Sequence, residues 1–192
     1  VQDYEECRKV VDETMDTYGR IDVLVNNAGV VSRGESFFKA DMEDIRRTMD
    51  INVMGTIHMI HAVSKYMADQ QKGTIVNIGS ICGTMANSES VGYHASKGAV
   101  EMVTKSLARE LSGYGIRVVC VSPGWVRTEM IDDTVAKIGA SLHMKGRIVE
   151  PEEIAGAVYL MTLDEASAVN GTTVMADDGY SAFKGIDGGQ RL

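Results

Sequence analysis

The chain has 192 residues, of which 44% are hydrophobic and 24% are charged, and its formal net charge at pH 7 is −8. This length and apolar content predict a single domain over residues 1–192, with an irregular tail from about residue 180. An acidic chain without a basic stripe argues against nucleic acid as a partner, and no apolar run is long enough to cross a membrane. The three scattered cysteines suit neither a disulfide framework nor a zinc site, so we expect a cytoplasmic protein with reduced thiols and no metal.

Hydrophobic periodicity divides the chain into alternating strands and helices. In chain order, the predicted elements are a helix at 3–18, a strand at 21–25, a long helix at 45–67, a strand at 74–79, a helix at 93–112, a strand at 116–121, a variable stretch at 125–148, a helix at 151–161 and a strand at 172–176. This alternation predicts an α/β fold with parallel strands and helices on both faces of the sheet.

Polar or glycine-rich segments follow three of the predicted strands. They are Asn26-Asn27-Ala28-Gly29, Ser80, and Pro123-Gly124. Ligands bind outside the carboxyl ends of strands in open parallel sheets, so we expect these segments to form one site. The alternative interpretation is that Asn-Gly and Pro-Gly pairs only make tight turns.

Tyr93 and Lys97 lie four residues apart in the predicted helix at 93–112. Residues at this spacing share a helical face with Cβ atoms roughly 5–6 Å apart, so the ammonium group can lie close to the phenol. A phenol beside a fixed cation can donate a proton in carbonyl–alcohol redox chemistry. Lowering a tyrosine pKa from ~10 to about 7 requires ~4 kcal/mol. A unit charge at ~4 Å supplies about that much at an effective dielectric of ~20, so we expect Lys97 to lower the pKa of Tyr93.

A second set of residues repeats this spacing: Ser167, Tyr180 and Lys184. In both sets a serine precedes the tyrosine by thirteen residues. However, Ser167 falls in a turn, and Lys184 lies in a glycine-rich tail with no predicted helix to hold the pair. We interpret the second set as coincidence.

Taken together, the chain resembles the short-chain dehydrogenase/reductase family. The segments that carry the resemblance are Asn26-Asn27-Ala28-Gly29, Asn52 in Asp50-Ile51-Asn52-Val53, Ser80, Tyr93 with Lys97, and Pro123-Gly124 with Thr128. The resemblance implies a Rossmann-like doubly wound parallel sheet that binds NAD or NADP and acts on a small-molecule carbonyl or alcohol substrate. It also implies a homo-oligomer, a dimer or a tetramer.

By the same resemblance, four residues carry the chemistry. Tyr93 is the catalytic acid/base, Ser80 hydrogen-bonds the substrate oxygen, Lys97 holds the nicotinamide ribose, and Asn52 positions a water in a proton relay. The implied cofactor-binding residues are Asn26, Ala28, Gly29, Tyr93, Lys97, Pro123, Gly124, Val126 and Thr128. The substrate class stays open between fatty-acyl thioesters, sugars or polyols, and steroids.

One part of the family pattern is not found. The chain contains no Gly-x-x-x-Gly-x-Gly turn to receive the cofactor pyrophosphate. We therefore expect an incomplete sheet in which the first two βα units, roughly 60 residues, are missing ahead of residue 1. The strand at 21–25 would then be a bare apolar edge, and the chain alone would bind dinucleotide weakly. A second hypothesis follows: a non-catalytic fragment that acts only as an oligomerisation or scaffold subunit.

Overall fold

The computed structural model describes residues 1–182 except residues 33, 35 and 130. Its centre is a four-stranded sheet in which every neighbouring pair of strands is parallel. In spatial order the strands are β1 (Val23–Asn26), β2 (Gly73–Ile78), β3 (Ile116–Pro123) and β4 (Thr173–Ala176). The predicted α/β fold with a parallel sheet is confirmed, and all four carboxyl ends lie on one edge of the sheet.

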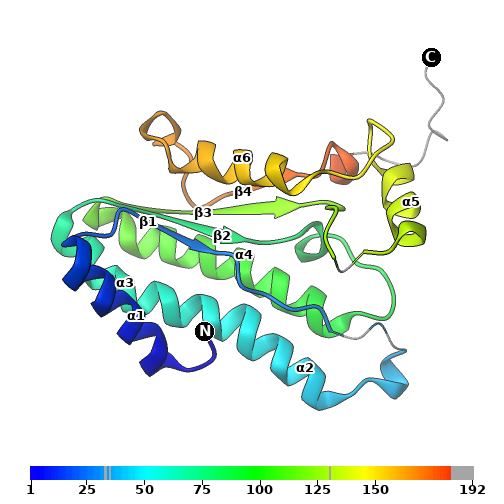
Figure 1. Cartoon of the computed structure of the whole chain (residues 1–192), viewed down its shortest axis with the longest axis horizontal. Coiled ribbons are helices and arrows are strands. Elements are labelled where there is room, and N and C mark those ends of the chain that lie inside the picture. The colour runs from blue at the N-terminus through cyan, green and yellow to red at the C-terminus, as the bar shows by residue number, and fades with distance from the viewer. Residues whose placement is uncertain (33, 35, 130, 183–192) are drawn as a thin grey trace.

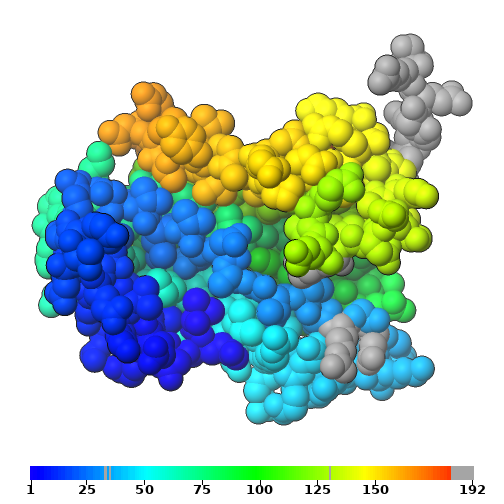
Figure 2. All heavy atoms as spheres, in the orientation of Figure 1, coloured from blue at the N-terminus to red at the C-terminus, as the bar shows by residue number. Residues whose placement is uncertain are grey.

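Helices cover both faces of the sheet (Figure 1). On one face lie α3 (Gly55–Gln70) and α4 (Val91–Leu111), with α1 (Tyr4–Tyr18) packed outside α3 and α2 (Met42–Met49) packed against α4. On the other face lies α6 (Pro151–Thr162). In the space-filling view, the blue amino-terminal and the yellow to orange carboxyl-terminal segments cover much of the green middle of the chain (Figure 2).

The two faces bury alternate residues of the central strands. Ile75 and Val118 pack into a cluster with residues of α1, α3 and α4, whereas Val76, Val119 and Val121 pack with residues of α6. These five side chains are fully buried. Both β2 and β3 are therefore continuous apolar runs, as expected for strands that are covered on both sides.

Local signals at the helix ends explain where the helices begin and end. The Asp3 carboxylate accepts a 3.0 Å hydrogen bond from Glu6 N at the start of α1, and Gly19 ends that helix at a φ of 73°. Pro151 opens α6, where Glu153 accepts a 2.9 Å bond from Glu150 N. The predicted bounds of both helices agree with the structure within a residue or two.

The long helix predicted at 45–67 is interrupted. The chain stays helical, but residues Asp50–Met54 form a π-helical turn between α2 and α3. A π turn inserts one extra residue into the helical ladder and changes the direction of the side chains around it. The prediction of one regular helix was therefore incomplete, and Asn52 lies inside the irregular turn.

The stretch predicted as variable also contains a helix, α5 (Asp133–Leu142). The Asp132 carboxylate begins it by accepting 2.8 Å hydrogen bonds from the N–H groups of Thr134 and Val135. Val135, Ile138 and Leu142 recur at helical spacing, so the sequence did contain a signal for this element.

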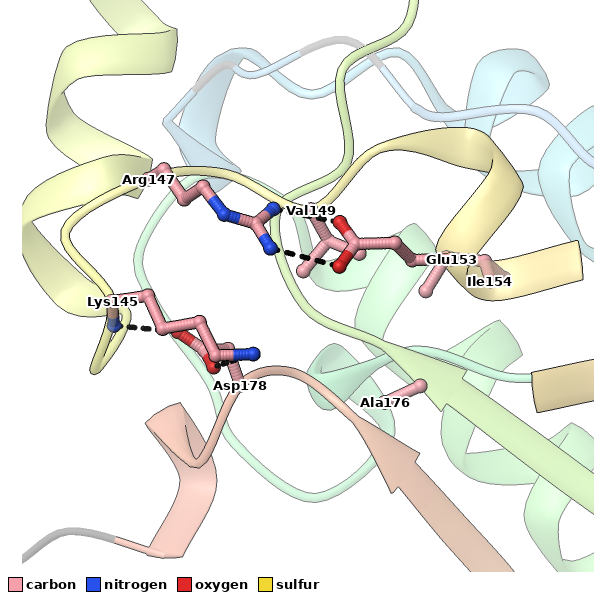
Figure 3. Close-up of a pocket in the computed structure, with 7 residues that line it drawn as sticks. All are labelled: Lys145, Arg147, Val149, Glu153, Ile154, Ala176 and Asp178. Carbon is pink, nitrogen blue, oxygen red and sulfur yellow. Dashed lines mark hydrogen bonds and ion pairs between the residues drawn. The ribbon is translucent and has the colours of Figure 1, made fainter. Parts of the chain in front are cut away.

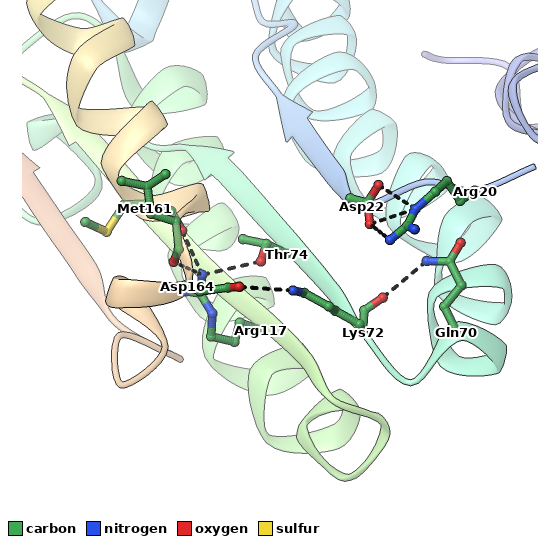
Figure 4. A network of polar contacts seen from close by, with 9 residues as sticks. Arg20, Asp22, Gln70, Lys72, Thr74, Arg117, Met161 and Asp164 are labelled. Carbon is green, nitrogen blue, oxygen red and sulfur yellow. Dashed lines mark hydrogen bonds and ion pairs between the residues drawn. The ribbon is translucent and has the colours of Figure 1, made fainter. Parts of the chain in front are cut away.

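Arg117 fastens the amino-terminal end of the sheet to the end of α6 (Figure 4). Its guanidinium donates to the carbonyl oxygens of Val169 at 3.0 Å, Met161 at 2.9 Å and Leu163 at 3.3 Å. It also donates to Thr74 Oγ1 at 3.3 Å. Arg117 is the second residue of β3, so this network lies at the opposite end of the strands from the polar segments that follow them.

Within the described residues, β1 pairs only with β2, so its second edge has no strand partner. Val23 and Val25 of this strand are 38% and 42% exposed. The described helices are all too short or too polar to span a bilayer.

Candidate active site

Three segments approach one another at the carboxyl ends of the strands. A Cβ atom placed on Gly29 would lie 3.3 Å from Asn52 Oδ1 and 3.7 Å from Lys97 Nζ. The turn after β1, the π turn and helix α4 therefore meet at this point. A side chain at this position would press on Asn52, so glycine favours the close approach.

Ser80, Tyr93 and Lys97 come together beside this point. Ser80 follows β2 and begins the short 3₁₀ turn Ile81–Gly83, where its Oγ accepts a 3.1 Å hydrogen bond from Cys82 N. Its side chain also lies close enough to the Tyr93 hydroxyl to act on the pKa of that phenol. One turn further along α4, Lys97 Nζ lies 5.7 Å from the centre of the Tyr93 ring and donates a 2.8 Å hydrogen bond to Ile78 O. The structure thus joins the three residues that the sequence placed in one set.

The electrostatics of this set differ from the sequence-based expectation. Burial raises the pKa of Tyr93 above its ordinary value, and the hydrogen bond to Ser80 only partly opposes that effect. Lys97 lies against the face of the phenol ring and is bound to a backbone carbonyl, and burial lowers its own pKa to about 8. The prediction that Lys97 lowers the Tyr93 pKa is therefore wrong for the chain by itself.

Asn52 acts as a clamp inside the π turn. Its Oδ1 accepts a 2.8 Å hydrogen bond from Val30 N, while its Nδ2 donates to Val30 O at 2.9 Å and to Ser96 Oγ at 3.0 Å. The side chain is 2% exposed. Asn52 therefore fixes the chain just after Gly29 to α4, and its role in positioning a water stays a prediction.

Asn26 begins a second chain of polar contacts that sequence reasoning missed. Its Nδ2 donates a 2.8 Å bond to Asn77 Oδ1, and Asn77 Nδ2 donates a 2.9 Å bond to Thr104 Oγ1. Asn77 and Thr104 are fully buried. The signal in the sequence was a single amide inside the apolar strand 74–79. A further missed residue is Ser32, whose Oγ accepts a 3.2 Å bond from Tyr93 N at the start of α4.

The third predicted segment, Pro123 to Thr128, lies along the end of β4. Pro123 pairs with Ala176, and Gly124 N donates a 3.2 Å bond to Ala176 O. A Cβ atom on Gly124 would lie 2.7 Å from His143 Nε2, so this glycine also permits a close approach. Val126 forms a parallel bridge with Val149, and Thr128 is half-buried. No hydrogen bond between described residues links this segment to Tyr93 or Lys97.

A cavity of about 160 Å³ lies behind this segment (Figure 3). The cations that line it are paired with carboxylates. Arg147 donates to Glu153 at 2.7 and 2.8 Å, and Lys145 Nζ lies 3.5 Å from Asp178 Oδ1. Because Val149 bridges to Val126, these ion pairs brace the segment that follows β3. We interpret the cavity as part of that support.

A second cavity, of about 120 Å³, lies beside the turn after β1 and is lined by Asn26, Asn27 and Ala28 together with residues of α3. The turn at 27–29 is exposed. Lys97 uses one N–H for Ile78 O, which leaves two of its three donors for the hydroxyls of a ligand. An open turn beside a cavity, with a buried cation at the end of the sheet, fits the adenosine and ribose groups of a dinucleotide.

The second serine–tyrosine–lysine set does not resemble the first. Tyr180 lies in a short 3₁₀ turn and packs against His143, with ring centres 6.1 Å apart. Ser167 follows another 3₁₀ turn, and Lys184 lies outside the described residues.

Known proteins share this sequence and architecture. The family described as enoyl-(acyl carrier protein) reductase matches residues 1–181. A 3-oxoacyl-[acyl-carrier-protein] reductase from Synechocystis sp. is 35% identical over 95% of this chain and 74% of its own length. A 3alpha-hydroxysteroid dehydrogenase from Mediterraneibacter gnavus is 36% identical over 92% of this chain and 72% of its own. The structure of a gluconate 5-dehydrogenase from Burkholderia cenocepacia, in complex with NADP and tartrate, superposes with a TM-score of 0.90. That pair has 29% identity, over 95% of this chain and 73% of the other.

Proposed function

Because this chain belongs to the short-chain dehydrogenase/reductase family of NAD(P)-dependent oxidoreductases, we propose that it interconverts a ketone and a secondary alcohol, with Tyr93 as the acid/base. The observation that carries the proposal is the meeting of Ser80, Tyr93 and Lys97 at the carboxyl end of β2. A bound NAD or NADP supplies the hydride chemistry. The chain's own residues hold the substrate oxygen and move its proton.

Tyr93 and Ser80 would share the reacting oxygen between their hydroxyl groups. The proximity of Ser80 to the Tyr93 hydroxyl supports this role, since two neighbouring donors can both point to a developing alkoxide. The pKa of Tyr93 lies above its ordinary value, so the phenol carries the proton that it would donate to that oxygen during reduction, and burial makes it a weaker acid than a free tyrosine. Ser80 would stabilise the charge before the proton arrives.

The cofactor residues take the roles that the turn geometry supports. Lys97 would hold ribose hydroxyls with its remaining donors, and Asn26, Ala28 and Gly29 would line the adenosine side. Pro123, Gly124, Val126 and Thr128 would border the nicotinamide, supported by the ion pairs behind them. Asn52 would position a water near Lys97.

The named relatives support this class of substrate. One reduces an oxoacyl group and another dehydrogenates a hydroxysteroid, so in both names the reacting oxygen is carried by the carbon that accepts or loses hydride. We propose a small molecule of this kind as the substrate, taken up by a homo-oligomer in the cytoplasm. Turnover with NADH compared with NADPH identifies which of the two dinucleotides the chain uses.

The test is the absorbance of reduced nicotinamide, measured with NADH and with NADPH against a panel of ketones and 3-oxoacyl thioesters. At cofactor concentrations high enough to offset weak dinucleotide binding by the chain alone, we expect turnover that Tyr93→Phe lowers by about 10²–10⁴-fold. Tyr114→Phe, at an exposed position near the end of α4, is the matched control and should leave turnover unchanged.

Two outcomes would overturn the proposal. One is turnover that survives Tyr93→Phe. The other is Tyr93-dependent reduction of an enoyl thioester alone, since the matching family carries that name. A stable oligomer with no turnover on any substrate would instead favour the scaffold hypothesis.

A further inference from the structure

Glu101 continues the helical stripe that carries the proposed chemistry. Tyr93, Lys97 and Glu101 follow one another at intervals of four residues on α4, so their side chains share one face. Glu101 is only 5% exposed. Burial of a carboxylate is costly unless the group is paired or hydrogen-bonded, so its contacts decide how it is tolerated.

The Glu101 carboxyl lies directly against Gly83, the last residue of the turn that Ser80 begins. A Cβ atom placed on Gly83 would lie 2.6 Å from Glu101 Oε1 and 3.0 Å from its Cδ. It would also lie 3.1 Å from Lys97 O. The end of the Ser80 turn therefore rests on this carboxyl and on the backbone of α4.

The other end of the same turn rests on the partner of Glu101. Ser122 Oγ, in β3, donates a 3.5 Å hydrogen bond to Glu101 Oε1 and is fully buried. A Cβ atom on Gly79, the residue before Ser80, would overlap Ser122 Oγ and would lie 2.6 Å from Cys120 Sγ. Glycines on both sides of Ser80 thus allow the segment to lie on the Glu101–Ser122 pair.

The groups around Glu101 come from three elements. Lys97 and Lys105 flank it on α4, Cys120 and Ser122 face it from β3, and the turn at 79–83 covers it. Burial raises the pKa of Glu101, and the positive charge of Lys105 opposes that effect. The carboxyl therefore has Lys105 as its nearby opposing charge and Ser122 as its hydrogen-bond donor.

We infer that Glu101 is a positioning residue, which holds the 79–83 turn at the height where the Ser80 hydroxyl meets Tyr93. The inference rests on the proposed function for its effect on catalysis. Removal of the carboxyl would let the turn sink toward α4 and would separate the two hydroxyls. Even a small displacement of a group that contacts the reacting atoms lowers the rate far more than it weakens binding.

The first experiment compares Glu101→Ala with Glu101→Gln in the 192-residue chain. We expect Ala to lower kcat about tenfold or more, with little change in the KM for the cofactor. Gln keeps the shape and an acceptor for Ser122, so it should restore kcat to within about threefold of the wild type. Glu110→Ala, at an exposed position of the same helix, is the matched control.

The second experiment uses the contact with Gly83. Gly83→Ala should lower kcat because its Cβ would strike the Glu101 carboxyl. The double variant Gly83→Ala/Glu101→Ala should be little worse than Glu101→Ala alone, because the closest obstructing group is gone and only the 3.1 Å approach to Lys97 O remains. Such non-additivity identifies residues in direct contact.

A third readout needs no turnover and separates this inference from the proposed function. Cys82 lies in the same turn and is half-buried, whereas Cys7 and Cys120 are buried. We expect Glu101→Ala to speed alkylation of Cys82 by about tenfold and Glu101→Gln to leave the alkylation rate unchanged.

If a folded Glu101→Ala variant is alkylated at the wild-type rate, the inference is overturned, even if the enzyme shows Tyr93-dependent turnover. Absence of any turnover, with faster alkylation in Ala, overturns the proposed function alone. If Ala does not fold, Glu101→Asp takes its place because it withdraws the carboxyl by one methylene, and purely additive effects of Gly83→Ala and Glu101→Asp overturn the inference.

Discussion

Lys97 is the residue at which chemistry and stability oppose each other. It is 7% exposed, and the hydrogen bond that it donates within the described part of the chain goes to Ile78 O at the end of β2. Burial of a cation with so few partners is unfavourable, and this is why its pKa falls to about 8. At neutral pH the ammonium form still predominates, so the chain keeps a costly charge where ribose hydroxyls would bind.

The free-energy cost of burying the Lys97 charge predicts that an uncharged replacement stabilises the fold. In the folded chain the pKa of Lys97 is about 8, against an ordinary 10.5, so between these values only the unfolded chain keeps the proton and stability rises with pH. At pH 7 the buried charge costs about 3 kcal/mol. Allowing about 1 kcal/mol for the lost hydrogen bond, we expect Lys97→Met to be about 2 kcal/mol more stable than the wild type at pH 7. The difference should nearly vanish by pH 9.5.

Urea denaturation at the two pH values measures this difference, with Lys65→Met at an exposed position of α3 as the control. A wild type that is more stable than Lys97→Met at pH 7, by an amount independent of pH, would contradict the burial argument. Activity should be lost in Lys97→Met at every pH.

At this scale the sequence predicted the members of the site but not their environment. Tyr93, Lys97 and Ser80 follow from spacing and from the end of a strand, which are local features. The sign of the Tyr93 pKa shift depends on how deeply packing buries the ring, and spacing does not contain that information. Glu101 and Asn77 were missed because a single polar residue within an apolar pattern does not form a recognisable sequence motif.

Among the elements, the π turn decides where Asn52 points. The periodicity of residues 45–67 predicts a helix and nothing more, because one extra residue in a turn barely disturbs an apolar pattern. α5 was overlooked because its stretch was interpreted by its position between motifs and not by its spacing. Elements with long apolar runs, such as β2, β3 and α4, were predicted within two residues of their ends.

Replacement of Asn52 should therefore affect stability as well as activity. Asn52→Ala leaves Val30 N and O and Ser96 Oγ without the partner they have in the wild type. We expect a loss of about 3 kcal/mol in the free energy of unfolding, measured by urea denaturation. Asn87→Ala, at an exposed position, should cost little. A loss below about 1 kcal/mol would mean that water replaces the clamp.

Across the whole molecule, the two ends of the sheet have different tasks. The carboxyl ends hold the proposed chemistry, and at the amino-terminal end Arg117 ties β3 to the end of α6 (Figure 4). The alternation of elements predicted the parallel sheet and its covered faces. The Arg117 network could not be predicted, because it joins residues more than forty positions apart through backbone oxygens.

Arg117→Met should separate stability from catalysis. The carbonyls of Met161, Leu163 and Val169 would lose a charged donor, at a cost of about 3 kcal/mol in the free energy of unfolding. We expect kcat at 25 °C to stay unchanged, with Arg109→Met at an exposed position of α4 as the control. A fall in kcat without a fall in stability would show that the two ends are coupled.

If the two ends of the sheet are independent, the length of β3 separates the contacts that stabilise this protein from the residues that react. Residues at the carboxyl ends of the strands could then be substituted to change substrate preference while Arg117 still joins β3 to α6. Engineering could also begin at the amino-terminal ends of the strands, by adding stabilising contacts there before the site at the carboxyl ends is redesigned.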